Sequence, residues 1–431
     1  MALPTALLFA TAAAGIAVND SPYTFLSIGD WGGAALETPS YTAKKNVYAV
    51  AGAMANKASE SNPQFIINTG DNFYWCGIQN TSDFQIAADW LNPYKAESLQ
   101  LKWYGTLGNH EYGYNVQAQL DMPQKYENWI MDDRYYTKRI EVSDGVYISL
   151  VVIDTSPCVQ EYRSSSQSGW DPCGSEYPTC SLSSDPSDEF EGPCKFHENI
   201  ISQDCTAQLS WFKNAMASIP DGDWKIVVGH HPIDELDVED FTSVLQDAGF
   251  DLYLNGHAHT LTQYTVDGSG AYVTTGAGSL VNTADQLGGT PHKDRTRSKT
   301  EGVETVQSPL GHSYKTVWNQ KVAGFTFHSF NSDFTELTTD FITYAGEVVH
   351  SFTVTKGSSP SPSPGPAPSP TGRCCHYSDA SCKEGDVCCK SNCDDPSSCS
   401  YTESGCEGHY GQIHNCQWDG STCKVGSPAQ S

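Results

Sequence analysis

The sequence predicts an α/β (α+β) protein built as a four-layer αββα sandwich, followed by a small disulfide-rich C-terminal module. Two patterns lead to this prediction. Up to residue 255, short apolar runs of strand length alternate with helical segments, an order that favours parallel strands joined by crossover helices. From residue 260 onward, apolar and polar residues alternate with a period of two, which is typical of antiparallel strands.

The individual elements follow from the same patterns. A helix is expected over residues 42–59, because the apolar residues from Val47 to Met54 fall on one helical face. Further helices are expected over residues 83–99, near 206–212 and over 240–248. The first of these is expected to break at Asn92-Pro93. Strands are expected at residues 25–28, 64–67, 103–107, 146–153, 225–228 and 252–255, and antiparallel strands at 261–266, 271–275, 324–330, 334–339 and 348–355.

Composition divides the chain into four parts. Residues 1–17 are apolar, rich in alanine and end in small residues, which predicts a secretory signal peptide, although no basic residues precede the apolar stretch. A buried N-terminal helix is the alternative. Residues 18–356 form the main domain, residues 357–372 a Pro- and Ser-rich extended linker, and residues 373–425 a Cys-rich module. So small a module buries little core and depends on its disulfides.

Charge and cysteine usage limit the partners and the compartment. The formal net charge of −27 argues against nucleic acid as a partner, and no later stretch is long and apolar enough to span a membrane. Six cysteines lie between Cys76 and Cys205 and ten between Cys374 and Cys423, which suits pairing in an oxidising compartment, but their connectivity cannot be read from the sequence. The protein is therefore expected to be secreted, extracellular or in a lysosome- or vacuole-like compartment, with a glycan at Asn80.

The segment from Cys158 to Cys205 interrupts the alternation of strands and helices. It is rich in serine, proline, glycine and acidic residues. A loop of this length inside a compact domain is usually functional or stapled. We expect a disulfide-held flap beside the functional site, and a solvated segment far from the site is the alternative.

Five predicted strands share one ending, in which an apolar run is followed by glycine and then by Asp, Asn or His. The endings are Gly29-Asp30, Gly70-Asp71, Gly108-Asn109-His110, Gly229-His230-His231 and Gly256-His257-Ala258-His259, and Tyr74 follows three residues after Asp71. Glycine lets the backbone turn sharply where a strand meets a loop, and the residues after it are metal ligands. The repetition predicts one metal site at the carboxyl ends of neighbouring strands.

In order and spacing, these blocks resemble those of the purple acid phosphatases of the small, mammalian-like tartrate-resistant type, within the calcineurin-like metallophosphoesterase superfamily. The resemblance covers roughly residues 22–356. It implies a ferric ion held by Asp30, Asp71, Tyr74 and His259, and a divalent Fe²⁺, Zn²⁺ or Mn²⁺ ion held by Asp71, Asn109, His230 and His257. Hard Fe³⁺ suits carboxylate and phenolate oxygens, and a phenol ionises at neutral pH only beside so acidic a cation.

The resemblance implies a secreted acid phosphatase that hydrolyses small phosphate monoesters by attack of a metal-bound hydroxide on phosphorus. Asn109 and His110 would bind the substrate, and His110 would assist the leaving group, with a hydrogen-bonding role as its alternative. The chain departs from its relatives at Ala258, where they have aspartate, and at Glu239, where they have a second substrate-side histidine. His231 is therefore a second candidate for proton delivery, with a packing role as its alternative.

Other functions fit the same sequence. A phosphodiesterase or nucleotide pyrophosphatase could use this fold, and a catalytically weak surface-binding protein could act through its C-terminal module. In that module, Tyr401, Tyr410 and Trp418 favour glycan or cell-wall binding, and an inert stabilising tail is the alternative. The histidines outside the blocks are expected at surface or packing positions: His292, His312, His328 and His350.

Overall fold

The computed structural model describes residues 23–35, 43–164, 170–173, 194–281 and 305–357, and four short strands between residues 374 and 425. The predicted signal peptide, residues 358–372 of the predicted linker, and His292 lie outside these residues. The chain divides into two compact units, Met1–Ser363 and Pro364–Ser431. Among the described helices, none combines the length and the apolar character needed to cross a bilayer.

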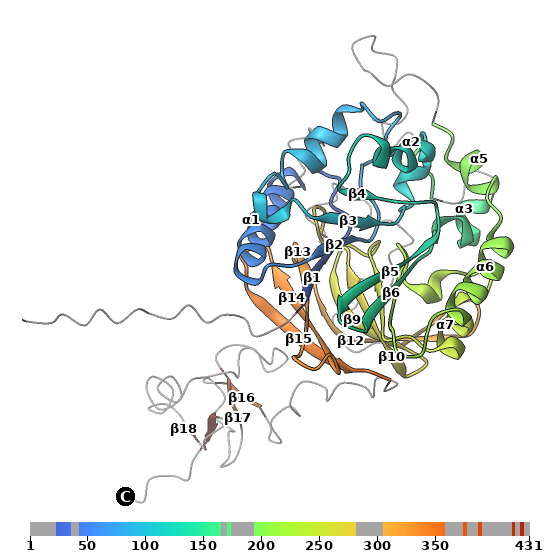
Figure 1. Cartoon of the computed structure of the whole chain (residues 1–431). Helices are drawn as coiled ribbons and strands as arrows, with labels where there is room; N and C mark the ends of the chain where they lie inside the picture. Colours follow the sequence, from blue (N-terminus) through green and yellow to red (C-terminus); the bar gives the residue numbers. More distant parts are fainter. Residues whose placement is uncertain are drawn as a thin grey trace, which may run out of the picture. The chain divides into compact units, whose positions relative to one another are not determined.

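The first unit contains two β-sheets, as predicted (Figure 1). The seven-stranded sheet has the order β15 (Val348–Thr355), β14 (Glu336–Thr343), β13 (Gly324–Phe330), β1 (Thr24–Ile28), β2 (Phe65–Asn68), β3 (Lys102–Gly105) and β4 (Trp129–Ile130). The eight-stranded sheet has the order β11 (Thr305–Gln307), β12 (Ser313–Gln320), β9 (Leu261–Val266), β10 (Ser269–Thr275), β8 (Leu252–Asn255), β7 (Trp224–Val228), β6 (Val146–Val152) and β5 (Tyr136–Ser143). Strands β1 to β4 pair in parallel, and so do β6, β7, β8 and β10.

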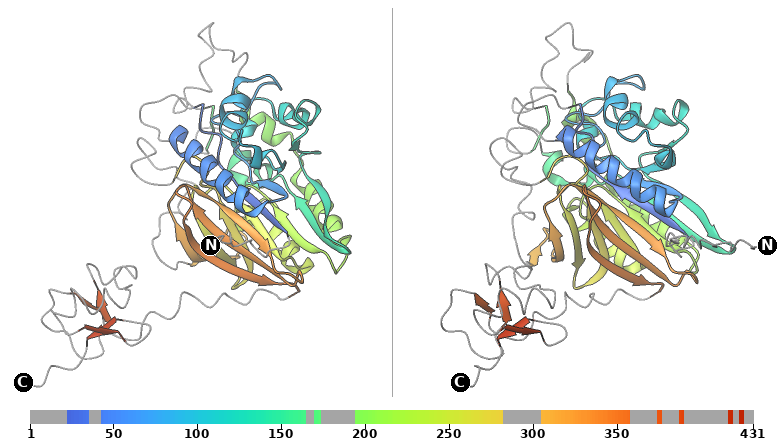
Figure 2. Two further views of the ribbon diagram at one scale, coloured as in Figure 1. Left: turned by 60° about the vertical axis from the view of Figure 1, so that its left-hand side comes forward. Right: turned by 90° about the vertical axis from the view of Figure 1, so that its left-hand side faces the viewer.

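The longer helices cover the outer faces of the sheets. Figures 1 and 2 show α1 (Ala43–Ser61) and the pair α6 (Cys205–Ala217) and α7 (Phe241–Ala248) on opposite sides of the paired sheets. Side-chain alternation along β6 explains the layers. Leu150 and Val152 belong to the core that also holds Phe25 of β1, whereas Val151 packs with Phe212 of α6. The predicted αββα arrangement is confirmed.

The N-termini of α6 and α7 are set by aspartate caps. Asp204 accepts a hydrogen bond from the Ala207 amide at 3.0 Å, and Asp240 accepts one from the Ser243 amide at 2.8 Å. The remaining short helices are π-helix η1 (Ile86–Leu91), α2 (Val116–Asp121), α3 (Gln160–Arg163), α5 (Phe196–Ile201), and 3₁₀ helices η2 (Glu97–Leu99), η3 (His110–Tyr112), η4 (Met122–Gln124), η5 (Ser156–Cys158) and η6 (Ile233–Glu235).

Three local predictions differ from the structure. The helical segment predicted over 83–99 is limited to η1 and η2, and the predicted break at Asn92-Pro93 is confirmed, since Pro93 lacks the amide that a continuing helix needs. Strand β10 is antiparallel to β9 but parallel to β8, so it is not part of a purely antiparallel group. Strands β4, β5, β11 and β12 of the first unit were not predicted. Charged residues on the exposed face of the edge strand β5, such as Arg139 and Glu141, hide its strand pattern.

The second unit has a four-stranded sheet in the order β16 (Cys374–His376), β17 (Val387–Cys389), β19 (Cys423–Val425) and β18 (Cys416–Trp418). Six of the ten module cysteines lie on these strands: Cys374, Cys375, Cys388, Cys389, Cys416 and Cys423. The strands are only three residues long, which agrees with a module whose order does not come from a large core.

Candidate metal centre

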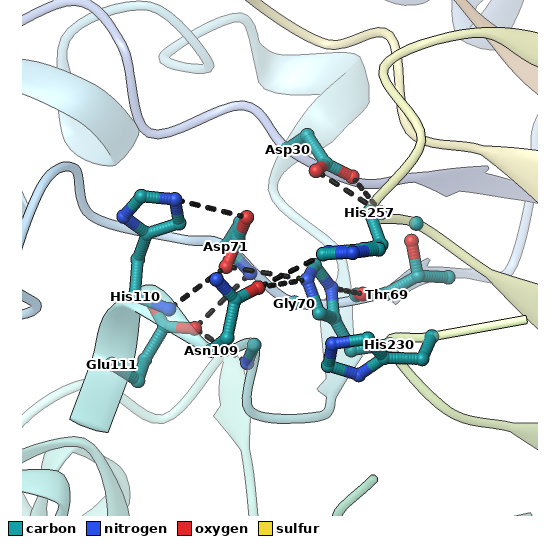
Figure 3. Close-up of polar contacts among 12 residues, drawn as sticks. Asp30, Thr69, Gly70, Asp71, Asn109, His110, Glu111, His230 and His257 are labelled. Carbon is teal, nitrogen blue, oxygen red and sulfur yellow. Dashed lines mark hydrogen bonds and ion pairs between the residues drawn. The ribbon is translucent and has the colours of Figure 1, made fainter. Parts of the chain in front are cut away.

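The loops after five parallel strands carry the predicted ligands. Strands β1, β2 and β3 are neighbours in one sheet, and β7 and β8 are neighbours in the other. The structure brings the side chains that follow them into one buried group, and even the most exposed of the seven predicted ligands, His257, is only 7% accessible. Figure 3 shows most of them: Asp30, Asp71, Asn109, His230 and His257 are labelled.

One part of the group, which we name the phenol cluster, consists of Asp30, Asp71, Tyr74 and His259. The hydroxyl oxygen of Tyr74 lies 3.3 Å from Asp30 Oδ1, 3.2 Å from Asp71 Oδ2 and 2.9 Å from His259 Nε2. His259 Nε2 is 3.1 Å from Asp30 Oδ1. Four potential ligand atoms, three oxygens and one nitrogen, therefore converge on one point.

The other part, the amide cluster, consists of Asp71, Asn109, His230 and His257. Asn109 Oδ1 lies 2.9 Å from His230 Nε2 and 3.2 Å from His257 Nδ1. Asp71 Oδ1 lies 3.3 Å from His230 Nε2. The two oxygens of Asp71 thus face different clusters, Oδ2 the phenol cluster and Oδ1 the amide cluster, so that Asp71 joins them.

Burial and charge act against each other in this group. Burial by itself would raise the pKa of the Asp71 carboxyl, but His230 and His110 outweigh it and hold that pKa well below its usual range. Burial by itself would lower the pKa of His230, but Asp71 raises it to about 9. A proton on His230 thus balances the Asp71 charge, and a bound cation would take over that balancing role.

The backbone is specialised to hold these ligands. In the described part of the chain, seven non-glycine residues have positive φ, and four of them are Asp30 (55°), Asp71 (52°), His257 (70°) and His259 (52°). Such strained conformations concentrate at functional sites. Glycines let the backbone approach the carboxylates, since a Cβ at Gly108 would lie 2.1 Å from Asp71 Oδ1. Placing these four side chains therefore requires strained backbone conformations at the residues that carry them.

His110 lies beside the shared aspartate, as Figure 3 shows. Its Nδ1 is 2.7 Å from the Trp75 carbonyl oxygen, which fixes the proton on Nδ1. Its Nε2 faces Asp71 Oδ2 at 3.8 Å. The rings of Tyr74 and Trp170 contact the imidazole with centroids at 4.5 and 4.9 Å. His110 is thus held rigidly with Nε2 directed into the site.

His231 lies behind the amide cluster, with its ring centroid 4.2 Å from that of His257. Its Nδ1 is 2.8 Å from the Thr155 hydroxyl and its Nε2 is 3.0 Å from the Tyr162 hydroxyl. Burial and the neighbouring His230 lower its pKa well below the usual range. Both nitrogens are engaged and the ring favours neutrality, so this geometry suits the packing alternative better than proton delivery.

Glu111 is an organising residue to which the sequence analysis gave no role. Its carboxylate accepts hydrogen bonds from the backbone amides of Asp71, Asn72, Phe73 and Gly108, at 3.1, 2.9, 3.2 and 2.5 Å. Burial and Asp71 raise the pKa of Glu111 to about 7. Its position directly after His110 is the only local signal, because three of the four amides it binds belong to the loop after β2.

Glu239, which stands where relatives have a histidine, lies outside the ligand group. Its side chain is partly exposed, and its carboxylate accepts a hydrogen bond from the Thr206 hydroxyl. Asp240 caps α7 and lies 3.1 Å from His312 Nε2. Of the other histidines outside the blocks, His328 is fully buried against Phe25 and has the predicted packing role.

The described parts of the Cys158–Cys205 segment lie against the site. Disulfides join Cys158 to Cys205 and Cys173 to Cys194, and Cys76 is also disulfide-bonded. Within the segment, Trp170 contacts His110 and Tyr162 contacts His231, and both aromatic rings pack on Phe196. This placement supports the prediction of a stapled flap beside the site over the alternative of a distant decoration.

Comparison with known proteins agrees with this geometry. The calcineurin-like phosphoesterase family model matches residues 23–261. Purple acid phosphatase 17 of Arabidopsis thaliana is 31% identical over 273 residues, which cover 61% of this chain and 70% of that protein. Tartrate-resistant acid phosphatase type 5 of Homo sapiens is 26% identical over 336 residues, covering 75% of this chain and 88% of that protein.

Among solved structures, GAP50, described as the anchor in the inner membrane complex of Plasmodium, aligns with a TM-score of 0.52 and 20% identity. The alignment covers 79% of this chain and 90% of that chain, and it shows a shared fold. The predicted resemblance is confirmed by the family match and by the identity to the plant enzyme. The chain belongs to the calcineurin-like phosphoesterase family and, within that family of hydrolases, to the purple acid phosphatases.

Proposed function

We propose that the chain is a secreted acid phosphatase that hydrolyses small phosphate monoesters at a centre of one ferric and one divalent ion. The observation that carries the proposal is the pair of clusters joined by Asp71, of which only one contains a phenol. Fe³⁺ is hard and suits the carboxylates and phenol of the first cluster, whereas the amide and imidazoles of the second suit Fe²⁺, Zn²⁺ or Mn²⁺.

The donor sets of the two clusters fit such a pair. Asp30, Asp71, Tyr74 and His259 would hold the ferric ion, and Asp71, Asn109, His230 and His257 the divalent ion. When bound, two such cations supply an acidified water as nucleophile and neutralise charge on the phosphate. Family membership supports a binuclear phosphatase, and the identity of the metals is our proposal.

The protein's own residues position the substrate. Asn109 and His110 follow β3 next to the shared Asp71, so they line the place where a phosphate would sit. His110 carries one proton on Nδ1, bound to the Trp75 carbonyl, and proton donation would require a second proton on Nε2, which faces Asp71. From there it can pass that proton to the departing alkoxide oxygen. We assign proton delivery to His110 in preference to His231, whose nitrogens are both engaged.

Several features support export from the cytoplasm. Every described cysteine of the first unit is disulfide-bonded, and disulfides persist in oxidising compartments. Asn80 is exposed in a turn, with its Oδ1 bound to the Ser82 amide at 2.8 Å, and is accessible for a glycan. The C-terminal module remains a predicted glycan- or cell-wall-binding unit. Deleting residues 357–431 and comparing retention on insoluble polysaccharides tests that role, and equal retention of both forms contradicts it.

The function is tested on the full chain purified from an iron-replete host. We expect a visible tyrosinate-to-iron absorption band, iron and a second metal in the protein, and faster turnover of an aryl phosphate monoester than of the matching diester at acidic pH. Tyr74→Phe should remove the band. Tyr94→Phe is the matched control, because Tyr94 is an equally buried phenol outside both clusters.

Each alternative gives a different result. A colourless, active enzyme without iron contradicts the ferric assignment. Negligible monoester turnover beside rapid diester turnover identifies a phosphodiesterase. A protein that takes up no metal and turns over neither substrate supports the surface-binding function.

A further inference from the structure

The outer nitrogen of His257 faces a carboxylate that no sequence block contains. Glu235 Oε2 lies 3.9 Å from His257 Nε2, within ion-pair distance. The inner nitrogen of the same ring, Nδ1, lies 3.2 Å from Asn109 Oδ1 inside the amide cluster. The His257 ring therefore bridges the cluster and Glu235.

The chemistry of imidazole decides where the proton of His257 lies when the ring acts as a ligand. A ligating nitrogen must offer its lone pair, so Nδ1 cannot carry the proton. The neutral ring then carries its proton on Nε2, the nitrogen that faces Glu235. A carboxylate is the natural acceptor for that N–H group.

His230 shows a related arrangement with a closer acceptor, at hydrogen-bond distance. Its Nε2 faces the amide cluster, and its outer nitrogen, Nδ1, is 2.9 Å from the carbonyl oxygen of Thr69. Both imidazoles of the amide cluster thus direct their outer nitrogen at an oxygen acceptor. Metal-bound histidines generally donate that proton to a carboxylate, a carbonyl or water, which fixes the ring and makes it more basic.

The local fold holds Glu235 where this contact can form. Pro232 leads into the 3₁₀ helix η6, whose turn is closed by the Glu235 amide bound to the Pro232 carbonyl at 3.0 Å. The neighbouring Ile233 and Leu236 are buried at 0% and 1% exposure and anchor the turn. The Glu235 side chain is 18% exposed, so it lies at the edge of the site near His257, the most exposed ligand.

We propose that Glu235 is a positioning residue for His257 and thereby sets the affinity of the amide cluster for its divalent ion. This inference rests on the proposed two-metal function. Position 258, between the two ligand histidines, is alanine and offers no carboxylate. Glu239 is on the same segment, but its carboxylate is bound to the Thr206 hydroxyl. Glu235 therefore supplies the carboxylate that supports His257.

The test measures Zn²⁺ binding to the full-length chain by competition with a chelating dye. Replacing such a supporting group typically weakens metal affinity by about 10–100-fold, and we expect a loss of that size in Glu235→Ala. Glu235→Gln should fall between Glu235→Ala and the wild type, because its amide oxygen still accepts the Nε2 proton but carries no charge. Glu239→Ala is the matched control and should bind Zn²⁺ like the wild type.

Two further readouts separate positioning from a general structural effect. The tyrosinate-to-iron band and the melting temperature without added Zn²⁺ should be the same in Glu235→Ala and the wild type, because the contact that carries the proposal is made to His257 of the amide cluster. Unchanged Zn²⁺ affinity in Glu235→Ala, or an equal loss in Glu239→Ala, overturns the proposal. Normal Zn²⁺ binding by a wild-type chain that hydrolyses no phosphate ester counts against the proposed function alone.

Discussion

A single methyl group at Gly108 should disable the metal centre, because it strikes the one residue shared by both clusters. A Cβ at position 108 would lie 2.1 Å from Asp71 Oδ1 and 2.3 Å from the Asp71 amide nitrogen, whereas ordinary contact begins at 3.4 Å. The second atom belongs to the backbone, so a rotation of the Asp71 side chain cannot relieve the clash. The loop must move by about 1 Å, and a displacement of that size in a catalytic group costs roughly 100-fold in rate.

We therefore expect Gly108→Ala to lower kcat/KM for an aryl phosphate by at least about 100-fold, equivalent to about 2.7 kcal/mol of transition-state stabilisation. Both metals should be depleted together, because Asp71 Oδ1 and Oδ2 face different clusters. Gly222→Ala is the control, since a Cβ there meets nothing within 4 Å. A Gly108→Ala protein that keeps two metals per chain and the wild-type kcat/KM would refute the reasoning about Asp71.

Three further predictions concern stability. Glu111→Ala leaves four buried backbone amides without their carboxylate. It should lower the free energy of unfolding, measured in urea, by at least about 2 kcal/mol. Glu111→Gln keeps one acceptor oxygen, so its free energy of unfolding should fall by less. Burial lowers the pKa of His328 to about 3, so below pH 6.5 the unfolded chain binds a proton that the folded chain does not. This contribution to stability is complete above pH 6.5 and should be lost on acidification by about 1.4 kcal/mol per pH unit down to pH 3. His328→Gln should flatten the dependence of the unfolding midpoint on pH between 6 and 4, and an unchanged slope contradicts the assignment. Gly52→Ala, at an open position inside α1, should raise the free energy of unfolding by up to about 1 kcal/mol, and a lower midpoint would show that the position is not open.

The ligand group could be predicted because its signal is local. Each ligand follows a buried strand and a glycine, as in Gly70-Asp71 and Gly256-His257, and parallel strands place such endings at the same edge of a sheet. The two-sheet fold was predictable for the same reason, since alternation and strand length are properties of short segments. Features that depend on a distant partner could not be predicted in this way.

Glu111 and Glu235 illustrate what local patterns omit. Glu111 acts on the loop after β2, and Glu235 faces a histidine after β8, 22 positions away in the sequence. Nothing in the residues beside either glutamate indicates these contacts. Glu239 has the sequence spacing from His230 at which relatives carry a histidine, yet the turn of η6 directs a different acid toward the site. Spacing alone therefore identifies a ligand at the end of a strand more reliably than a supporting residue in an irregular loop.

The distribution of ligands between the sheets explains why the backbone strain at this site persists. Asp30, Asp71 and Asn109 follow strands of one sheet, and His230 and His257 follow strands of the other. The His257 amide binds both oxygens of Asp30, at 3.1 and 2.9 Å, so the positive φ at these two residues is held by a contact between the sheets. Relaxing either residue alone would break that contact inside a buried core, at a cost of the same order as the strain it relieves. The packing of the two sheets therefore prepares the ligand geometry in advance of metal binding, and Asp71, which belongs to both clusters, is the point where this preparation is most sensitive to change.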